Sequence, residues 1–302
     1  MTAILEQVAV LVVFSMVGYL LARGGVVKVE HGKTLSGLLV YVFSPCVSFS
    51  TFSSQFTKEY LSQKYLLMLV SLGILLLLML VCHFAAQRMR GTDYERKVFE
   101  YSMIIPNFGY MGTALVGSLY GDAVLLDCML FALPLNVYCY TIGYNLLTGN
   151  TGGKFSLKRI FTPPMIGMLA GCVVGLLKLP IPDFLSTAVS KGASCMGPIS
   201  MLLTGITVSQ FRMKALIVNI RAYIVTAVRL VVVPVVLALL LRVVGLGFAV
   251  TAAVCIFAMP CGLNTIVYPQ LVGEDCKNGA SLALLSTAFS LITIPLCLNF
   301  LL

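Results

Sequence analysis

The stretch MIIPNFGYMGTALVGSLYGD, residues 103–122, is an apolar segment with a break near its start. Pro106 has no backbone N–H to donate, and its ring clashes with the preceding helical turn. Gly109, three residues later in the chain, adds backbone freedom. Apolar residues then continue to about Tyr120. The stretch therefore predicts two half-helices separated by an unwound segment around residues 106–109.

A second stretch of the same design, AMPCGLNTIVYPQLVGED, occupies residues 258–275. It again places a proline, a glycine and an asparagine (Pro260, Gly262 and Asn264) ahead of an apolar half. A broken backbone is tolerated within a bilayer only where protein or a watery cavity satisfies the freed groups. Paired broken segments in two halves of a chain are typical of transporter binding sites. The two stretches therefore predict that a small solute is carried across a membrane where the breaks meet.

The composition supports a membrane protein. The chain has 302 residues, of which 59% are hydrophobic and 10% are charged, whereas soluble domains carry about 25% charged residues. Apolar runs such as residues 66–86 exceed the roughly 18 residues that mark a membrane span. The net charge of +9 would suit nucleic acid, but the basic residues lie beside short gaps between apolar spans. We therefore expect an all-α polytopic membrane protein in a lipid bilayer, with no nucleic-acid partner.

The apolar segments predict ten transmembrane helices. They cover residues 3–22, 34–54, 64–86, 97–120, 123–147, 160–180, 187–209, 219–243, 247–273 and 278–301. Most of the 20 basic residues lie in or beside the odd-numbered gaps, which the positive-inside rule places in the cytoplasm. Both termini are therefore expected outside a cell (plasma) membrane, with the central loop in the cytoplasm.

The longest polar gap, residues 148–159, divides the chain into halves of five spans each. Because five is odd, the second half would enter the membrane with inverted orientation. The fourth span of each half is the interrupted one. The expected fold is thus two inverted five-helix repeats, residues 1–147 and 160–302, with broken crossing helices four and nine. Glycines at 167, 171 and 175 predict a close helix neighbour for span six, within the chain or at a dimer interface.

The motifs IPNFGYMG (residues 105–112) and AMPCG (residues 258–262), set in ten spans, resemble the fourth- and ninth-span motifs of the auxin efflux carrier family. That family includes the plant PIN auxin exporters and bacterial carriers of malonate and related carboxylates. The resemblance implies the fold of the bile-acid sodium symporters and a homodimer. It also implies an elevator-like movement of helices 3–5 and 8–10 against a scaffold of helices 1, 2, 6 and 7. The short central loop is similar to that of bacterial members.

The predicted crossing suits an anion. Each half-helix after a break begins with unpaired amides and the positive end of its dipole, and such helix ends bind anions. Asn107 and Asn264 add side-chain amides that can bind a carboxylate, although either could instead cap a simple kink. The resemblance assigns Asn107 to the substrate-binding asparagine of the auxin exporters. We expect the substrate site to contain Pro106, Asn107, Phe108, Gly109, Arg229, Pro260, Cys261, Gly262 and Asn264.

Three charged residues are expected within the membrane. Arg229 lies near the middle of span eight, where a charge costs about 3 kcal/mol. It could counter an anionic substrate, form a structural salt bridge with Asp127 or Glu100, or extend to a membrane surface. Asp127 and Glu100 are also candidate sites for a driving proton or cation, although Glu100 could simply pair with Lys97.

Enzyme and metal chemistry find no support in the sequence. The ten cysteines form no Cys-x-x-Cys pair and the two histidines are far apart, so no metal or other cofactor is expected. No Ser-His-Asp arrangement or phosphate-binding glycine loop is present. The predicted function is secondary transport or uniport of small organic anions, such as auxin-like or malonate-like carboxylates, with Na⁺ or H⁺ as a possible driving ion. Two alternatives stay open: a sodium-coupled symporter of the bile-acid type, and a membrane sensor that binds a solute without transporting it.

Overall fold

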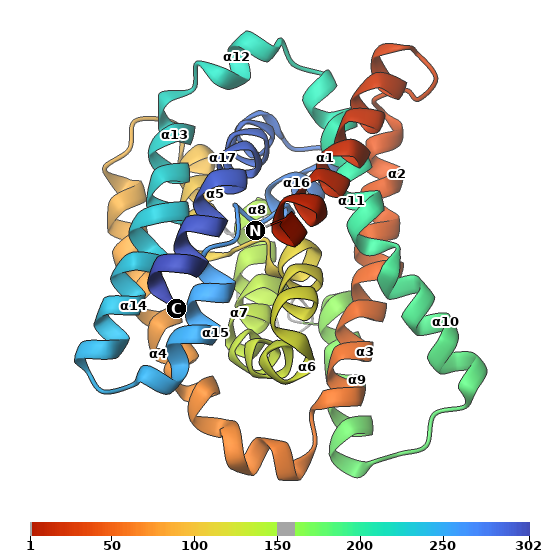
Figure 1. Cartoon of the computed structure of the whole chain (residues 1–302). Coiled ribbons are helices and arrows are strands. Elements are labelled where there is room, and N and C mark those ends of the chain that lie inside the picture. Colours follow the sequence, from red (N-terminus) through yellow and green to blue (C-terminus); the bar gives the residue numbers. More distant parts are fainter. Residues whose placement is uncertain (1, 150–160) are drawn as a thin grey trace.

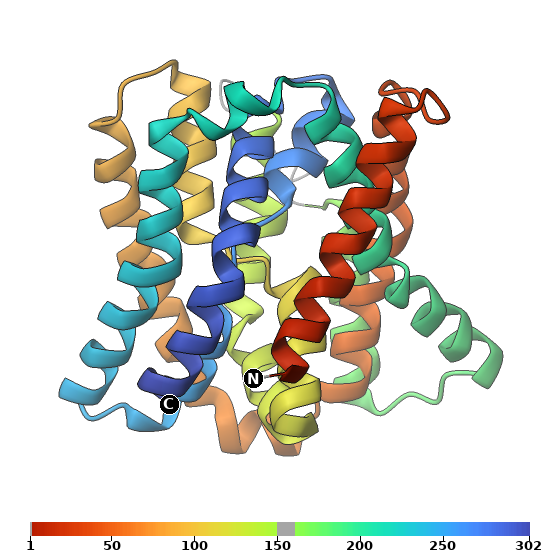
Figure 2. The same ribbon diagram turned by 45° about the horizontal axis from the view of Figure 1, so that its top comes forward.

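The computed structural model of the chain describes residues 2–149 and 161–302, and every regular element in these ranges is a helix (Figure 1). The helices run roughly alongside one another, and α1 begins at the same end of the bundle at which α17 ends (Figure 2). Of the linker expected at residues 148–159, all but Thr148 and Gly149 lies outside the described residues.

The first half of the chain contains eight α-helices. They are α1 (Thr2–Arg23), α2 (His31–Leu38), α3 (Ser44–Gln55), α4 (Lys58–Gln87), α5 (Asp93–Ile104), α6 (Thr113–Phe131), α7 (Leu133–Tyr138) and α8 (Tyr144–Leu147). Single π-helical turns join α2 to α3, precede α6 and join α7 to α8, at Leu39–Phe43, Phe108–Gly112 and Cys139–Gly143. Such turns often occur at functional sites. Gly121, with φ +74°, bends the chain inside α6, where the expected spans four and five join.

The second half contains nine α-helices in the described residues. They are α9 (Pro163–Leu177), α10 (Asp183–Ser194), α11 (Met196–Ser209), α12 (Met213–Ile217), α13 (Ile220–Ala227), α14 (Val233–Val243), α15 (Val250–Phe257), α16 (Asn264–Val272) and α17 (Lys277–Leu301). A fourth π-helical turn, Val228–Val232, joins α13 to α14. The helix α15 is buried on every side from Ala252 to Phe257, so it forms the centre of the core.

Fewer helices than expected are long and apolar enough to cross a membrane as continuous rods. Within the described residues five meet this criterion, or up to six if the bent pair Ala123–Phe131 and Leu133–Leu147 is one span. The remaining expected spans are the interrupted segment after α5 and three shorter apolar helices, Val12–Arg23, Pro163–Leu177 and Gly247–Phe257. The structure thus shows a multi-pass, all-helical protein, and the ten-span inverted repeat stays a prediction.

The three regularly spaced glycines have the close neighbour that the sequence predicted, and it is a helix of the same chain. A Cβ atom at Gly167 would lie 2.6 Å from the carbonyl oxygen of Pro45, and one at Gly171 would lie 2.7 Å from that of Phe49. A Cβ atom at Gly175 would lie 2.5 Å from the carbonyl oxygen of Phe52. These distances leave no room for a side chain, so α9 packs directly on the backbone of α3. In both views α1 lies beside α11 (Figures 1 and 2), and a Cβ atom at Gly205 of α11 would lie 2.7 Å from the backbone nitrogen of Tyr19.

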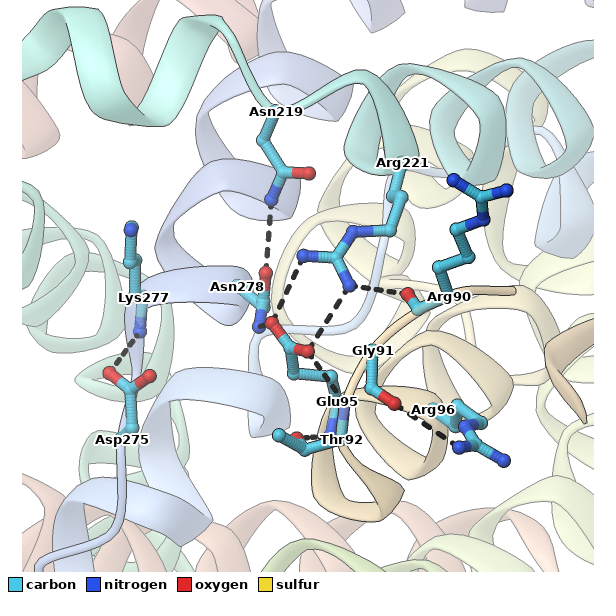
Figure 3. Close-up of polar contacts among 10 residues, drawn as sticks. All are labelled: Arg90, Gly91, Thr92, Glu95, Arg96, Asn219, Arg221, Asp275, Lys277 and Asn278. Carbon is cyan, nitrogen blue, oxygen red and sulfur yellow. Dashed lines mark hydrogen bonds and ion pairs between the residues drawn. The ribbon is translucent and has the colours of Figure 1, made fainter.

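A cluster of polar side chains ties together the ends of α5, α13 and α17 (Figure 3). Both guanidinium Nη atoms of Arg221 donate to the carboxylate of Glu95 at 3.1 Å, and Asn278 donates to the same carboxylate at 3.1 Å. Glu95 also forms a capping box with Thr92, which fixes the first turn of α5. Burial alone would raise the pKa of Glu95, but these donors outweigh it and lower the pKa to about 2. The cluster therefore anchors the helix that leads to the first break.

Candidate functional site

The two interrupted segments lie against each other at the centre of the molecule. After α5 ends at Ile104 the chain is extended, and the second segment is unwound between Phe257 and Asn264. The two unwound stretches run antiparallel. The N–H of Asn107 donates to the carbonyl of Pro260 at 2.8 Å, and the N–H of Gly262 donates to that of Ile105 at 3.1 Å. Backbone groups released by one break are therefore satisfied by the other, as an apolar surrounding requires.

The residue types at the crossing explain this close pairing. The prolines at 106 and 260 interrupt both helices because neither can donate a backbone hydrogen bond. A Cβ atom on Gly262 would lie 3.1 Å from the carbonyl oxygen of Ile105, so a side chain there would push the two unwound stretches apart. The backbone amide of Cys261, the residue before Gly262, donates to the hydroxyl of Ser286 on α17 at 3.1 Å. Ser286 therefore fixes the second unwound stretch to α17. The sequence did not indicate this contact.

A small cavity of about 60 Å³ lies beside the crossing. Of the predicted site residues, Pro106, Phe108, Gly109, Gly262 and Asn264 line it, while Asn107, Arg229, Pro260 and Cys261 do not. A larger neighbouring cavity of about 330 Å³ is lined by α1, α3, α6 and the junction of α10 with α11. The two share Val47, Gly109 and Met196, so the larger one leads to the crossing. None of the described residues that line either cavity is charged.

The two asparagines of the crossing differ in their contacts. Asn107 is 1% exposed, and neither the oxygen nor the nitrogen of its side chain has a hydrogen-bond partner in the described part of the chain. The side-chain nitrogen of Asn264 instead donates to the hydroxyl of Tyr101 at 2.9 Å and lies 2.9 Å from the sulfur of Cys139. An unpaired buried amide costs about 1–3 kcal/mol per group. The side-chain amide of Asn107 therefore keeps its full hydrogen-bonding capacity in the described part of the chain, whereas Asn264 is held by α5 and the turn after α7.

Arg229 is completely buried, at 0% exposure, in the π-helical turn of residues 228–232. The structure shows neither the salt bridge with Asp127 or Glu100 nor the extension to a membrane surface that the sequence left open. Residues 2–149 and 161–302 offer it no ion pair, since Asp127 pairs with Lys64 and Glu100 contacts His83, and its full burial excludes extension to a membrane surface. Its Nη1 atom donates to the carbonyl of Met103 at 3.4 Å.

The two candidate acids lie away from the cavities. One carboxylate oxygen of Asp127 accepts a hydrogen bond from Tyr60 at 2.7 Å, and the other lies 2.9 Å from the ammonium of Lys64. An Oε atom of Glu100 lies 3.0 Å from the ring Nδ1 of His83. Lys97, the expected partner of Glu100, forms an ion pair with Asp93, one helical turn earlier on α5. No group of three metal-ligating side chains occurs among the residues that the structure describes.

Sequence reasoning missed several polar groups on the cavity wall. Asn136 on α7 lines the cavity at the crossing, as does Ser44 at the start of α3. Ser48, one turn further along α3, donates to the hydroxyl of Tyr140 at 3.2 Å. A polar residue two positions after a proline inside an apolar span, as in Pro134 and Asn136, was the signal that could have identified this wall.

Two interrupted helices that meet beside a cavity in a helical membrane protein are typical of transporters. The family described as "Membrane transport protein" matches the chain twice, over residues 3–154 and 150–298. The chain therefore belongs to this family, the auxin efflux carrier family that its motifs resemble. The two matches, one in each half, fit a chain built from two related repeats.

Two archaeal relatives are similar along their whole lengths. An uncharacterized transporter of Methanothermobacter thermautotrophicus is 22% identical over 307 residues, covering 96% of both chains. An uncharacterized transporter of Methanocaldococcus jannaschii is 23% identical over 301 residues, covering 97% of both chains. Their common class, a membrane transporter of matching length, agrees with the family assignment.

Proposed function

We propose that the protein is a secondary active transporter or uniporter of small organic anions, and that it binds a carboxylate at the crossing of the two interrupted helices. The observation that carries this proposal is Asn107, which is buried at the crossing with its whole side-chain amide unpaired in the described residues. An amide in this state offers a donor to a carboxylate and an acceptor to a hydroxyl. Membership of a transport family supports movement of the bound molecule across the bilayer.

The anion would be held without a charged side chain. The helical segments that follow the breaks start at Phe108 and Asn264, so their positive dipole ends lie at the crossing. In a low-dielectric surrounding such ends stabilise a carboxylate. Val47, Phe108 and Met196 offer apolar surface in the same cavity. The site would therefore take a carboxylate with a small apolar body.

Transport would proceed by elevator-type alternating access. The glycine-mediated contact of α9 with α3 supports a rigid scaffold, built from the predicted helices 1, 2, 6 and 7. The cavities lie between α1, α3 and α11 on one side and the crossing on the other. The predicted helices 3–5 and 8–10 would carry the crossing past this scaffold. A homodimer in the cell membrane, with both termini outside and the central loop in the cytoplasm, completes the proposal.

The driving ion would act through Glu100 or Asp127. Glu100 is the stronger candidate for a proton, because its side chain is 13% exposed and contacts a second titratable group, His83. Asp127 has two firm partners in Tyr60 and Lys64, which favours a structural role. Replacing Glu100 with glutamine removes the titratable group and keeps the shape, so it should abolish proton-driven uptake and leave substrate binding intact.

Uptake of radiolabelled mono- and dicarboxylates into proteoliposomes tests the proposal. Sodium, proton and voltage gradients are imposed one at a time, with liposomes lacking protein as the control. Uptake driven by protons or by voltage alone would support the carrier or uniporter proposed here. Uptake that requires sodium would favour the symporter of the bile-acid type. Binding of a carboxylate without uptake of any would overturn transport in favour of a sensor.

A further inference from the structure

Arg229 is a buried cation that the cavity does not use. Two of its nitrogens, Nε and Nη2, have no hydrogen-bond partner within the described residues, and it lines neither cavity at the crossing. Isolated buried charges are costly unless fixed polar groups compensate them. The groups around Arg229 must therefore explain why an arginine is stable at this depth.

One of these groups is a carbonyl that the first break has released. In a continuous helix the N–H of Asn107 would donate to the carbonyl of Met103, four residues earlier. At the crossing that N–H donates instead to Pro260, at 2.8 Å. The carbonyl of Met103 accepts from Nη1 of Arg229 at 3.4 Å. Arg229 thus supplies the donor that the broken helix α5 lacks.

The second group belongs to the other interrupted helix. The guanidinium carbon of Arg229 lies 5.0 Å from the ring centroid of Phe257, a contact of the cation–π type. Phe257 is the last residue of α15, as Ile104 is of α5. Arg229 therefore lies beside the carboxyl ends of both half-helices that enter the crossing.

Electrostatics favours a cation at this place. The carboxyl end of a helix carries a partial negative charge, which a nearby cation stabilises, most strongly when the pair is buried. Two such ends converge on Arg229, whereas the amino ends of the outgoing segments start beside the cavity at Phe108 and Asn264. The positive charge thus belongs on the side where α5 and α15 end, and the anion belongs on the side of the cavity, where the outgoing segments begin.

We infer that Arg229 is a positioning residue that holds the carboxyl ends of α5 and α15 together and so preserves the backbone pairing of the crossing. It does not touch the transported molecule. The inference concerns the crossing itself and holds for any substrate.

Hydrogen–deuterium exchange of the whole protein in lipid nanodiscs tests this role without a substrate. The variant Arg229→Met removes the charge and keeps a long apolar side chain. Exchange at the amides of Asn107 and Gly262, which carry the pairing, should become about tenfold faster or more, because local opening follows the lost contacts. Arg229→Lys keeps the charge and should restore part of the protection.

The matched control is Arg242→Met, since Arg242 lies on α14 of the same helical segment but is exposed and bonded to the carbonyl of Leu301. This variant should leave the crossing amides unchanged. Wild-type exchange at both amides in Arg229→Met, particularly with carboxylate uptake lost, would return Arg229 to the substrate site and overturn the inference. A uniform rise in exchange along the chain would also overturn the inference, because it would show a general loss of stability and not a loss of pairing at the crossing. If Arg229→Met does not fold, wild-type exchange at both amides in Arg229→Gln would overturn it equally.

Discussion

Asn107 and Asn264 show how residues of one type at matched positions acquire different roles. Both are buried at the crossing, but Asn264 donates to Tyr101 and contacts Cys139, while Asn107 has no side-chain partner in the described ranges. A buried polar group without a partner lowers stability. We propose that the side chain of Asn107 finds its hydrogen-bond partner in the bound substrate.

Removing the Asn107 amide should therefore separate function from stability. In Asn107→Ala we expect carboxylate uptake to fall at least about tenfold, because each lost hydrogen bond to a charged group is worth about 1.5–3 kcal/mol. The thermal midpoint of the purified variant should equal or exceed that of the wild type, since an unsatisfied buried group is removed. Asn264→Ala breaks internal contacts and should lower both quantities. A large loss of stability in Asn107→Ala would contradict the assignment.

The contact between α3 and α9 belongs to the scale of the helix and depends on glycine. Replacing Gly171 with valine would force side-chain atoms into the backbone near Phe49, which a Cβ atom would already approach at 2.7 Å. Overpacking of this kind costs about 1–3 kcal/mol, so the thermal midpoint should fall. A Cβ atom added at Gly73 on α4 would meet no other atom within 4 Å, and Gly73→Val is the matched control. Equal thermal midpoints of Gly171→Val and Gly73→Val would show that α3 and α9 can move apart without loss of stability.

The polar cluster at the ends of α5, α13 and α17 predicts a pH dependence. Glu95 has a pKa of about 2 in the folded protein, against an ordinary value of 4.5. Because the folded value is the lower one, the stabilisation is complete above about pH 4.5 and is lost as the pH falls towards 2. At about 1.4 kcal/mol per pH unit this difference corresponds to at most about 3 kcal/mol, because the Glu95 side chain is 24% exposed and water screens its contacts.

Melting curves of the wild type and Glu95→Gln, measured across this range, check the sign. The wild type should be the more stable at neutral pH, and the difference should shrink as the pH falls below about 4.5. Asp93→Asn is the control, since Asp93 is 69% exposed in its ion pair with Lys97 and exposed pairs contribute little. A difference between wild type and Glu95→Gln that stays constant down to pH 2 would refute the proposed linkage.

The sequence predicted features of these elements that depend on neighbouring residues, and it did not predict contacts between residues far apart in the chain. Breaks at Pro106 and Pro260 follow from local backbone chemistry, and the structure shows both helices interrupted there. The glycine spacing on α9 likewise predicted a close helix neighbour. The π-helical turn that buries Arg229 has no local signature, and its contact with Met103 joins residues 126 positions apart. Contacts between residues so far apart in the sequence can be seen only in the folded structure.

At the scale of the whole molecule, the tightly packed helices α3 and α9 lie on one side of the cavities and the crossing lies on the other. The helices α3 and α9 meet through backbone contacts that leave little freedom for relative sliding. Cavities without charged lining residues in the described part of the chain separate the crossing from α1 and α3. We propose that the elevator movement takes place at this boundary, because the cavities leave space on one side of it and the packed pair α3 and α9 flanks the other.

A cleavable crosslink across this boundary should therefore stop transport. Ser50 on α3 and Thr113 at the start of α6 line the larger cavity from its two sides. Cysteines at both positions, in a chain whose ten native cysteines are replaced, should lose uptake when joined by a bifunctional thiol reagent and regain it on cleavage. The carbonyl oxygen of Ser53 on α3 lies 3.3 Å from the position of a Cβ atom on Gly175 of α9. Joining Ser53 to the next residue, Leu176, therefore links two helices of the packed pair and should leave uptake intact. Full uptake by the chain crosslinked between Ser50 and Thr113 would mean that α3 and α6 keep a fixed distance, and the elevator movement would have to be abandoned for a smaller local gate at the crossing.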